Sequence, residues 1–184
     1  KYSVGMPGMH GTVEANYVVQ HCDCLVAVGM RFDDRVTGNL NTYAKQAKII
    51  HFDIDPSEIN KNVRVNLAVV GDCKQTLPAV TRLLDKTTHQ AWIDGFKPYA
   101  EKEDNKVIHP AIYPTEGPLL MGEVVRKVSE ATDHKAILVT DVGQTQMFAC
   151  RYFKYSQNRS IVTSGGCGTI NAASIDISLL LSRY

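Results

Sequence analysis

No apolar run in the sequence approaches the roughly 20 residues that a membrane-spanning helix needs, and no secretion-signal pattern opens the chain. Basic and acidic residues almost balance, which leaves a net charge of +1 and no basic footprint for nucleic acid. The five cysteines are an odd, scattered set, a poor disulfide framework that favours a reducing, cytoplasmic location. These absences predict a globular protein without a membrane or nucleic-acid partner.

Several catalytic motifs are also missing. The sequence has no G-x-S-x-G turn for a nucleophilic serine, and no two histidines have the spacing of a metal-binding pair. A single residue separates Cys22 from Cys24, so packing is a simpler interpretation of them than a zinc or redox role. No metal site is predicted within the chain, and His10 is the one histidine kept as a candidate for binding.

The first half of the chain alternates strand and helix signals. Three uninterrupted apolar runs are typical of buried parallel strands: 24–28, 48–54 and 67–70. We expect the first of them to be buried on both faces. A helix is expected over 12–21 with Gly11 as its N-cap, another begins after Asp55, and a helical stripe covers 77–84. The pattern predicts an α/β fold with a parallel, Rossmann-like sheet, whose ligands bind beyond the carboxyl ends of the strands.

The alternation stops between residues 87 and 116, where prolines and charged residues gather around one expected helix, 90–104. It then resumes with these expected elements: a helix face over 120–128, a strand over 136–140, a helix over 146–153 and a strand over 160–163. The chain is therefore divided into a first domain, a linker and the start of a second α/β domain: 1–86, 87–116 and 117–184.

The opening loop GMPGMHG places glycines at 5, 8 and 11, directly before the first expected helix. Glycine lets the backbone approach a pyrophosphate, and the N–H groups of the helix then point at that group. The spacing is not the G-x-G-x-x-G of dinucleotide-binding units, and no strand precedes it, so an ordinary NAD site is disfavoured. A surface turn remains the alternative interpretation.

Charged side chains follow the first two strands. In GMRFDDRVTG, Arg31 and Arg35 could fork onto phosphate oxygens, or they could form internal ion pairs with Asp33 and Asp34. Asp53 could accept hydrogen bonds from ribose or ribityl hydroxyls, or it could cap the helix that follows. Together with the glycine loop, these residues suit an extended ligand with two phosphates and polyol groups.

Two loops of the second domain, DVGQTQ and SGGCG, directly follow expected strands. Gly143 and Gln144 offer backbone and amide donors, while Gly165, Gly166 and Gly168 allow close approach of the backbone. A second phosphate-bearing cofactor is predicted there.

The sequence GMHGTVEANYVVQHCDCLVAVGMRFDDRVTGNL, followed by AKIIHFDIDPSEINKN and VVGDCKQTL, resembles the catalytic large subunit of acetolactate synthase, also called acetohydroxyacid synthase. The likeness covers residues 1–169, and the HGT…RFDDRVTG combination is specific to this family among thiamine-diphosphate enzymes. It implies that residues 1–86 form the second half of a central FAD-binding domain, and that residue 117 begins the thiamine-diphosphate domain.

The resemblance implies a set of FAD-binding residues: Met9, His10, Gly11, Gly29, Arg31, Asp33, Arg35, Asp53, Ile54, Glu58, Gly71 and Asp72. The candidates for the second cofactor are Gly143, Gln144, Gln146, Met147, Gly165, Gly166 and Gly168. On this interpretation the opening glycines let the chain wrap closely around a flavin dinucleotide.

The reaction that the resemblance implies is decarboxylation of pyruvate on thiamine diphosphate and transfer of the two-carbon unit to pyruvate or 2-oxobutyrate, in branched-chain amino acid biosynthesis. FAD undergoes no net redox change in this family. A homo-oligomer and a small regulatory subunit are the implied partners.

The sequence departs from the family's pattern in several places. Thr145 stands where histidine is usual, Cys167 stands where leucine is usual, and the tail 170–184 is atypical. The chain begins at Lys1, which suggests a fragment, and we expect the Mg²⁺-binding G-D-G…N element and the cofactor-activating glutamate to lie outside it. No synthase activity is therefore expected from the chain alone. The alternatives are a stand-alone flavin-nucleotide binding module, or another thiamine-diphosphate enzyme such as a glyoxylate carboligase or pyruvate oxidase.

Overall fold

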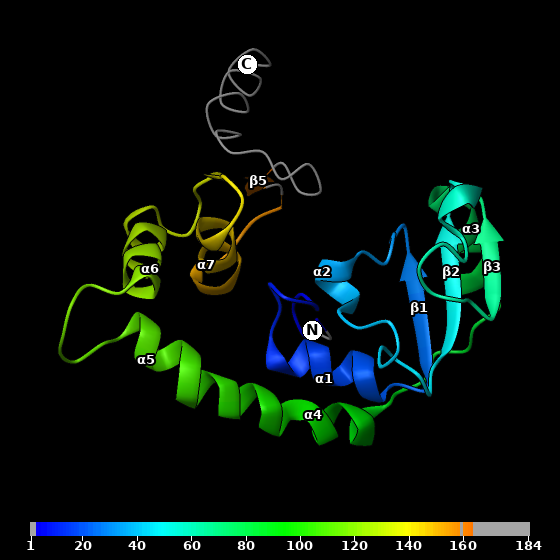
Figure 1. Ribbon diagram of the computed structural model, residues 1–184, viewed down its shortest axis with the longest axis horizontal. Coiled ribbons are helices and arrows are strands. Elements are labelled where there is room, and N and C mark those ends of the chain that lie inside the picture. Colours follow the sequence, from blue (N-terminus) through cyan, green and yellow to red (C-terminus); the bar gives the residue numbers. More distant parts are fainter. Residues whose placement is uncertain (1–2, 159, 164–184) are drawn as a thin grey trace, which may run out of the picture. The chain divides into compact units, whose positions relative to one another are not determined.

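The computed structural model describes residues 3–158 and 160–163. The chain divides into two compact units, residues 1–100 and 101–184 (Figure 1). The helix α4 (Gln90–Glu103) confirms the helix expected over 90–104. The boundary between the two units falls near the end of this helix.

The first unit is built on a three-stranded parallel sheet with the order β1-β2-β3. Its strands are β1 (Cys24–Val28), β2 (Lys48–Asp53) and β3 (Leu67–Val70). Cys24 lies opposite Lys48, and Asp53 lies opposite Val70. Figure 1 shows the strands side by side, with α3 next to β2. The predicted parallel sheet is therefore confirmed.

The first helix is α1 (Val13–His21), and both its first residue and its N-cap lie one residue later than the sequence suggested. Thr12 is the N-cap, and its Oγ1 accepts a hydrogen bond of 3.1 Å from the N–H of Ala15. Gly11 as N-cap was wrong, because the threonine hydroxyl satisfies a helix N–H that glycine has no side chain to reach. The remaining helices of this unit are α2 (Asp34–Thr37), the 3₁₀ turn η1 (Pro56–Glu58) and α3 (Cys73–Thr81).

One face of the sheet carries the core of the first unit. One cluster of this core comprises five buried residues: Ala27, Phe32, Tyr43, Ala44 and Ile49. On the other face, Val26 and Val28 are 53% and 44% exposed, so the expectation that β1 is buried on both faces was wrong. An apolar run indicates that a strand can be buried, but it does not indicate which other elements of the fold cover its faces.

The helical stripe expected over 77–84 is only partly helical. α3 ends at Thr81, and Leu83 and Leu84 lie beyond it, 85% and 68% exposed. The apolar spacing that predicted one continuous helix therefore extends past the last helical hydrogen bonds.

Burial of Tyr43 makes the stability of this unit depend on pH in the alkaline range. Loss of solvation, with a smaller contribution from Cys22, raises the pKa of Tyr43 to about 12 from its usual 10.0. Because the folded pKa is the higher one, this stabilisation is complete below pH ~10 and is lost as the pH rises through 12, and the free energy of unfolding falls by about 3 kcal/mol over that range. We expect Tyr43→Phe to flatten that decline, measured by urea unfolding of the chain with Trp92 fluorescence. Parallel pH profiles for the two proteins would contradict the assignment.

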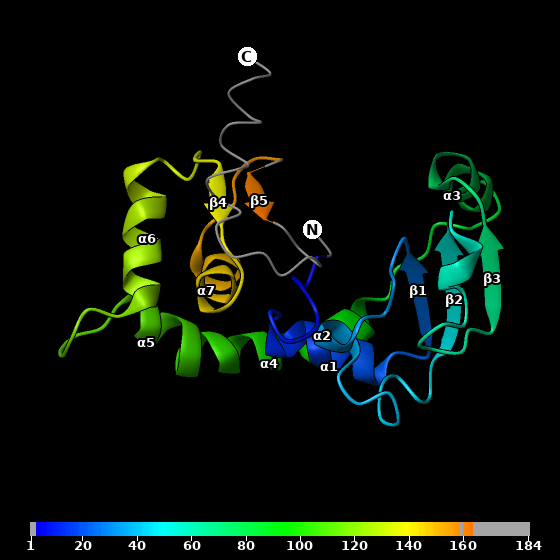
Figure 2. The same cartoon turned by 45° about the horizontal axis from the view of Figure 1, so that its top comes forward.

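The second unit contains the end of α4 and a short parallel sheet. Its elements are the π-helical turn η2 (Asp104–Ile108), α5 (His109–Ile112), α6 (Met121–Ala131), β4 (Leu138–Thr140), α7 (Gln144–Tyr152) and β5 (Ile161–Thr163). β4 and β5 pair in parallel, with Leu138 opposite Ile161 (Figure 2). The predicted helices and strands are all present, although α7 begins at Gln144, directly after its N-cap Gly143.

None of the described helices combines the length and the apolar content that crossing a bilayer requires.

Candidate functional site

The carboxyl ends of the three strands of the first unit are joined by backbone hydrogen bonds. The N–H of Gly29 donates to the carbonyl of Phe52 (2.8 Å), and the N–H of Gly71 donates to the carbonyl of Asp53 (2.9 Å). Gly29, Asp53 and Gly71, each predicted from a different strand, are thus brought together at one edge of the sheet. We call this row the carboxyl edge.

The opening loop is attached to α2 and not only to the helix that follows it. The N–H of Met9 donates to the carbonyl of Arg35 (2.8 Å), and both the N–H and the C=O of Gly8 are bonded by the side-chain amide of Asn16. A Cβ atom at Gly8 would lie 2.6 Å from the Arg35 carbonyl oxygen, and one at Gly11 would lie 1.9 Å from the Met6 carbonyl oxygen. These glycines therefore allow the chain to approach its own backbone.

The loop after β1 contains an internal ion pair, which the sequence analysis gave as the alternative to phosphate binding by its arginines. The Nε of Arg31 lies 3.2 Å from Oδ2 of Asp33, and Oδ1 of Asp33 accepts the N–H of Arg35 as the N-cap of α2. Between them, Phe32 has a φ of +52° and is buried, which anchors the loop in the core. The Arg31 side chain is 57% exposed, so this ion pair is weak and leaves guanidinium N–H groups available to a ligand.

Asp53 ends β2 with a buried carboxylate. It is 7% exposed, and its Oδ1 accepts the N–H of Asp55 at 2.9 Å. The helix cap after this strand is Asp55, whose Oδ1 accepts the N–H of Ser57, and that hydrogen bond lowers the pKa of Asp55. Asp53 is therefore free of the capping role that the sequence offered as its alternative.

The other predicted residues near this edge differ in their surroundings. Asp72 caps α3 by accepting the N–H of Lys74 (2.8 Å), and Glu58 forms an ion pair with Lys61 (2.6 Å). Ile54 is 70% exposed at the carboxyl edge, and Met9 is half exposed, whereas His10 is only partly exposed.

In the second unit, the loop after β4 begins a helix. Gly143 has a φ of +90° and is the N-cap of α7, and a Cβ atom there would meet no described atom within 4 Å. Gln144 is exposed, Met147 is partly buried, and the side-chain amide of Gln146 donates to Oγ1 of Thr163 (2.8 Å). The Gln146 bond connects the start of α7 to β5. Gly165, Gly166 and Gly168, together with Cys167 and the tail 170–184, lie outside the described residues.

One residue beside the carboxyl edge was not singled out from the sequence. His51 lies two residues before Asp53 on β2 and is fully buried, with its Nε2 3.5 Å from Oδ2 of Asp53. The signal was available in the string HFD, because alternate residues of a strand share a face.

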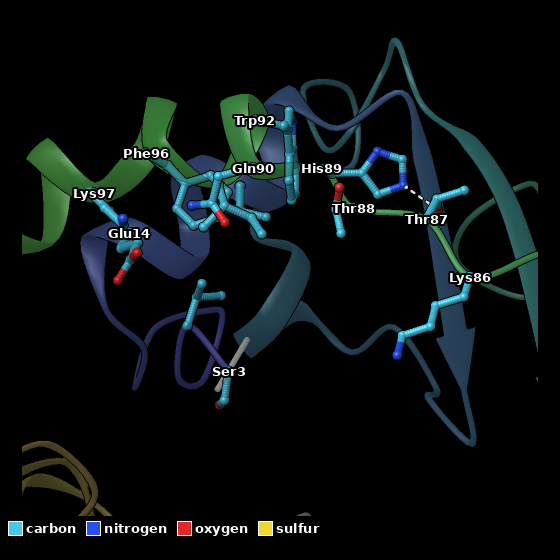
Figure 3. A pocket seen from close by; sticks show the side chains of 13 residues that line it. Ser3, Glu14, Lys86, Thr87, Thr88, His89, Gln90, Trp92, Phe96 and Lys97 are labelled. Carbon is cyan, nitrogen blue, oxygen red and sulfur yellow. Dashed lines mark hydrogen bonds between the residues drawn. The ribbon is translucent and has the colours of Figure 1, made fainter.

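A hollow of about 660 Å³ lies elsewhere in the first unit, between α1 and α4 (Figure 3). Trp92, Ile93 and Phe96 line it from α4, and Val18 lines it from α1. None of the predicted cofactor residues borders it, so it is separate from the carboxyl edge. Within the described part of the chain, no three side chains of His, Cys, Asp or Glu gather as a metal-binding group.

Comparison with known proteins finds a matching family model and several similar proteins. Residues 1–80 match the model of the thiamine pyrophosphate enzyme central domain. Acetolactate synthase 1, chloroplastic, of Nicotiana tabacum is 41% identical over 169 residues, which are 91% of this chain and 25% of that protein. The acetolactate synthase isozyme 2 large subunit of Escherichia coli is 41% identical over 171 residues, 92% of this chain and 29% of that subunit.

An archaeal protein extends the range of these relatives. The probable acetolactate synthase large subunit of Methanocaldococcus jannaschii is 40% identical over 179 residues, 91% of this chain and 29% of that subunit. The chain thus spans little more than a quarter of the length of the curated relatives it matches. Its first 80 residues are thus similar to the central domain of thiamine pyrophosphate enzymes, and over nine-tenths of its length it is about 40% identical to acetolactate synthases.

Proposed function

We propose that the chain is a segment of an acetolactate synthase, which condenses pyruvate with a second pyruvate or with 2-oxobutyrate. The observation that carries the proposal is the identity of about 40% over nine-tenths of the chain to acetolactate synthases of plants, a bacterium and an archaeon. Since those relatives are more than three times longer than the matched segment, the activity is proposed for the whole subunit and not for these 184 residues.

The carboxyl edge of the first unit is our proposed FAD site. Gly29 has a φ of +60°, and a Cβ atom there would meet no described atom within 4 Å, so its backbone is open to a ligand. The exposed guanidinium of Arg31 suits a phosphate, and the buried carboxylate of Asp53 suits polyol hydroxyls. The residues present therefore fit a flavin dinucleotide, held by the predicted set: Met9, His10, Gly11, Gly29, Arg31, Asp33, Arg35, Asp53, Ile54, Glu58, Gly71 and Asp72.

The loop before α7 is our proposed contact with thiamine diphosphate. The open surroundings of Gly143 and the exposed Gln144 fit a phosphate-bearing group, and Gln146 and Met147 complete the described part of this set. The cofactor, when bound, supplies stabilisation of negative charge on the carbon that loses CO₂. The chain's own residues hold and orient it, while the Mg²⁺ ligands are proposed to lie in other parts of the subunit.

The same proposal predicts the domain organisation, the cellular compartment and the assembly of the protein. The first 86 residues would be the second half of an FAD-binding domain, and 117 onward would begin the thiamine-diphosphate domain, joined by the linker 87–116. The four described cysteines are free, which suits a reducing compartment such as the cytoplasm. A homo-oligomer with a small regulatory subunit is the proposed assembly.

The test compares the intact subunit that contains this segment with the 184-residue chain. Each is supplied with pyruvate, thiamine diphosphate, Mg²⁺ and FAD, and acetolactate is measured. We expect product from the intact subunit and none from the chain alone. Acetolactate from the purified chain would contradict the requirement for the rest of the subunit. An intact subunit that decarboxylates glyoxylate or oxidises pyruvate, but forms no acetolactate, would overturn the proposed reaction.

A further inference from the structure

His51 is a buried titratable side chain that the proposed cofactor contacts do not use. It is 0% exposed, and neither of its ring nitrogens has a hydrogen-bond partner among the described residues. Buried polar groups are normally paired, so an unpaired imidazole inside a sheet calls for a physical explanation.

The surroundings of His51 restrict what its ring can reach. The strand register places it between Ala27 of β1 and Ala68 of β3, neither of which offers a polar side chain. The ring of Phe32 packs edge-on against the imidazole, with 5.1 Å between ring centroids. The carboxylate of Asp53, on the same face of β2, is therefore the polar group that these contacts leave within reach of the ring.

The two oxygens of Asp53 have different environments. Oδ1 accepts the N–H of Asp55 at 2.9 Å, a normal hydrogen bond. Oδ2 lies 3.5 Å from Nε2 of His51, a few tenths of an ångström beyond normal hydrogen-bond length. A small rotation of the carboxylate would close this gap, and each oxygen would keep a lone pair for a further donor.

We propose that His51 is a positioning residue for the cofactor: its Nε2–H holds Oδ2 of Asp53 and fixes the carboxylate in the orientation that accepts ligand hydroxyls. The inference rests on the proposed function, because the ligand at Asp53 is the polyol part of FAD. His51 itself touches no ligand. Its effect on binding passes through Asp53, which distinguishes it from a residue that only fills the core.

The test is a double-mutant cycle in the intact subunit, stripped of flavin and titrated with FAD by the quenching of flavin fluorescence. The single variants are Asp53→Asn and His51→Phe, which keeps an aromatic ring but removes the donor. We expect His51→Phe to weaken FAD binding about tenfold, because a hydrogen bond to a charged group is lost. His51→Gln, with an amide N–H in reach, is expected to recover most of the affinity.

The decisive comparison is between Asp53→Asn and the double variant. If His51 acts through Asp53, the double variant binds FAD no more weakly than Asp53→Asn alone. Additive losses, or normal FAD binding by His51→Phe, would overturn the inference. Thiamine-diphosphate affinity serves as the control and is expected to stay unchanged. If His51→Phe does not fold, His51→Asn, whose shorter amide ends farther from Asp53, takes its place in the same cycle.

The same data separate this inference from the proposal beneath it. Unchanged FAD binding by Asp53→Asn would show that the flavin does not use Asp53, so the proposed site itself would fail. Weaker binding by Asp53→Asn, with no coupling to His51, would leave the proposed site intact and reject the positioning role.

Discussion

Gly11→Ala is expected to destabilise the first unit by about 3 kcal/mol, at the upper end of what overpacking costs. The alanine Cβ would lie 1.9 Å from the carbonyl oxygen of Met6 and 2.7 Å from the carbonyl carbons of Met6 and Pro7. All three are backbone atoms, so no side-chain rotation relieves the clash and the loop itself must move.

That movement would break several contacts at once. The Met6 carbonyl accepts the N–H of Thr12 (3.0 Å), and Thr12 is both the N-cap of α1 and a donor to the carbonyl of Val4 (3.1 Å). Loss of an N-cap alone costs about 1 kcal/mol. The expected effect therefore combines backbone displacement with a weakened start of α1.

The measurement is urea unfolding of the chain, followed by the fluorescence of Trp92, the single tryptophan, which lies in the first unit. Gly95→Ala is the matched control. Gly95 lies inside α4, and a Cβ atom there meets no described atom within 4 Å. Alanine is expected to stabilise this helix by up to about 1 kcal/mol. Equal midpoints for the two variants would refute the role assigned to Gly11.

The glycines of the opening loop bring the chain close to its own backbone. Their spacing predicted close approach of the backbone to a phosphate-bearing ligand, with a surface turn as the alternative. The sequence alone cannot say what approaches, and in the structure it is the carbonyl groups of Arg35 and Met6. A Cβ atom at Gly29, in contrast, would meet no described atom within 4 Å, so close approach of a ligand is better argued at that glycine.

The elements themselves were largely predictable. Apolar runs identified β1, β2 and β3, and the alternation with helices identified their parallel pairing, because both depend on local pattern. The exposed face of β1 was not predictable, since burial depends on neighbours that a local pattern does not name. His51 was missed for a related reason: its importance arises from a buried neighbour, Asp53, and from the apolar residues on either side of it.

The second large effect is expected in the second unit, at the ion pair between Glu103 and Arg151. Glu103 is 6% exposed, at the end of α4, and its carboxylate accepts a hydrogen bond from the guanidinium of Arg151 on α7. Arg151→Met would remove the guanidinium that pairs with this buried carboxylate. We expect a loss of about 3 to 5 kcal/mol, the usual cost of removing one member of a buried pair.

A second variant separates charge burial from packing. Glu103→Leu combined with Arg151→Met removes both charges and is expected to recover most of the stability, because an apolar pair needs no compensation for desolvation. Lys127→Met is the control: it breaks the pair with Glu123 (2.7 Å), in which the lysine is 58% exposed, and is expected to cost less than about 1 kcal/mol. All four proteins are compared by urea unfolding with circular dichroism at the helix band. If Arg151→Met is no less stable than Lys127→Met, the buried pair contributes little, and the connection between α4 and α7 must depend on apolar contacts instead.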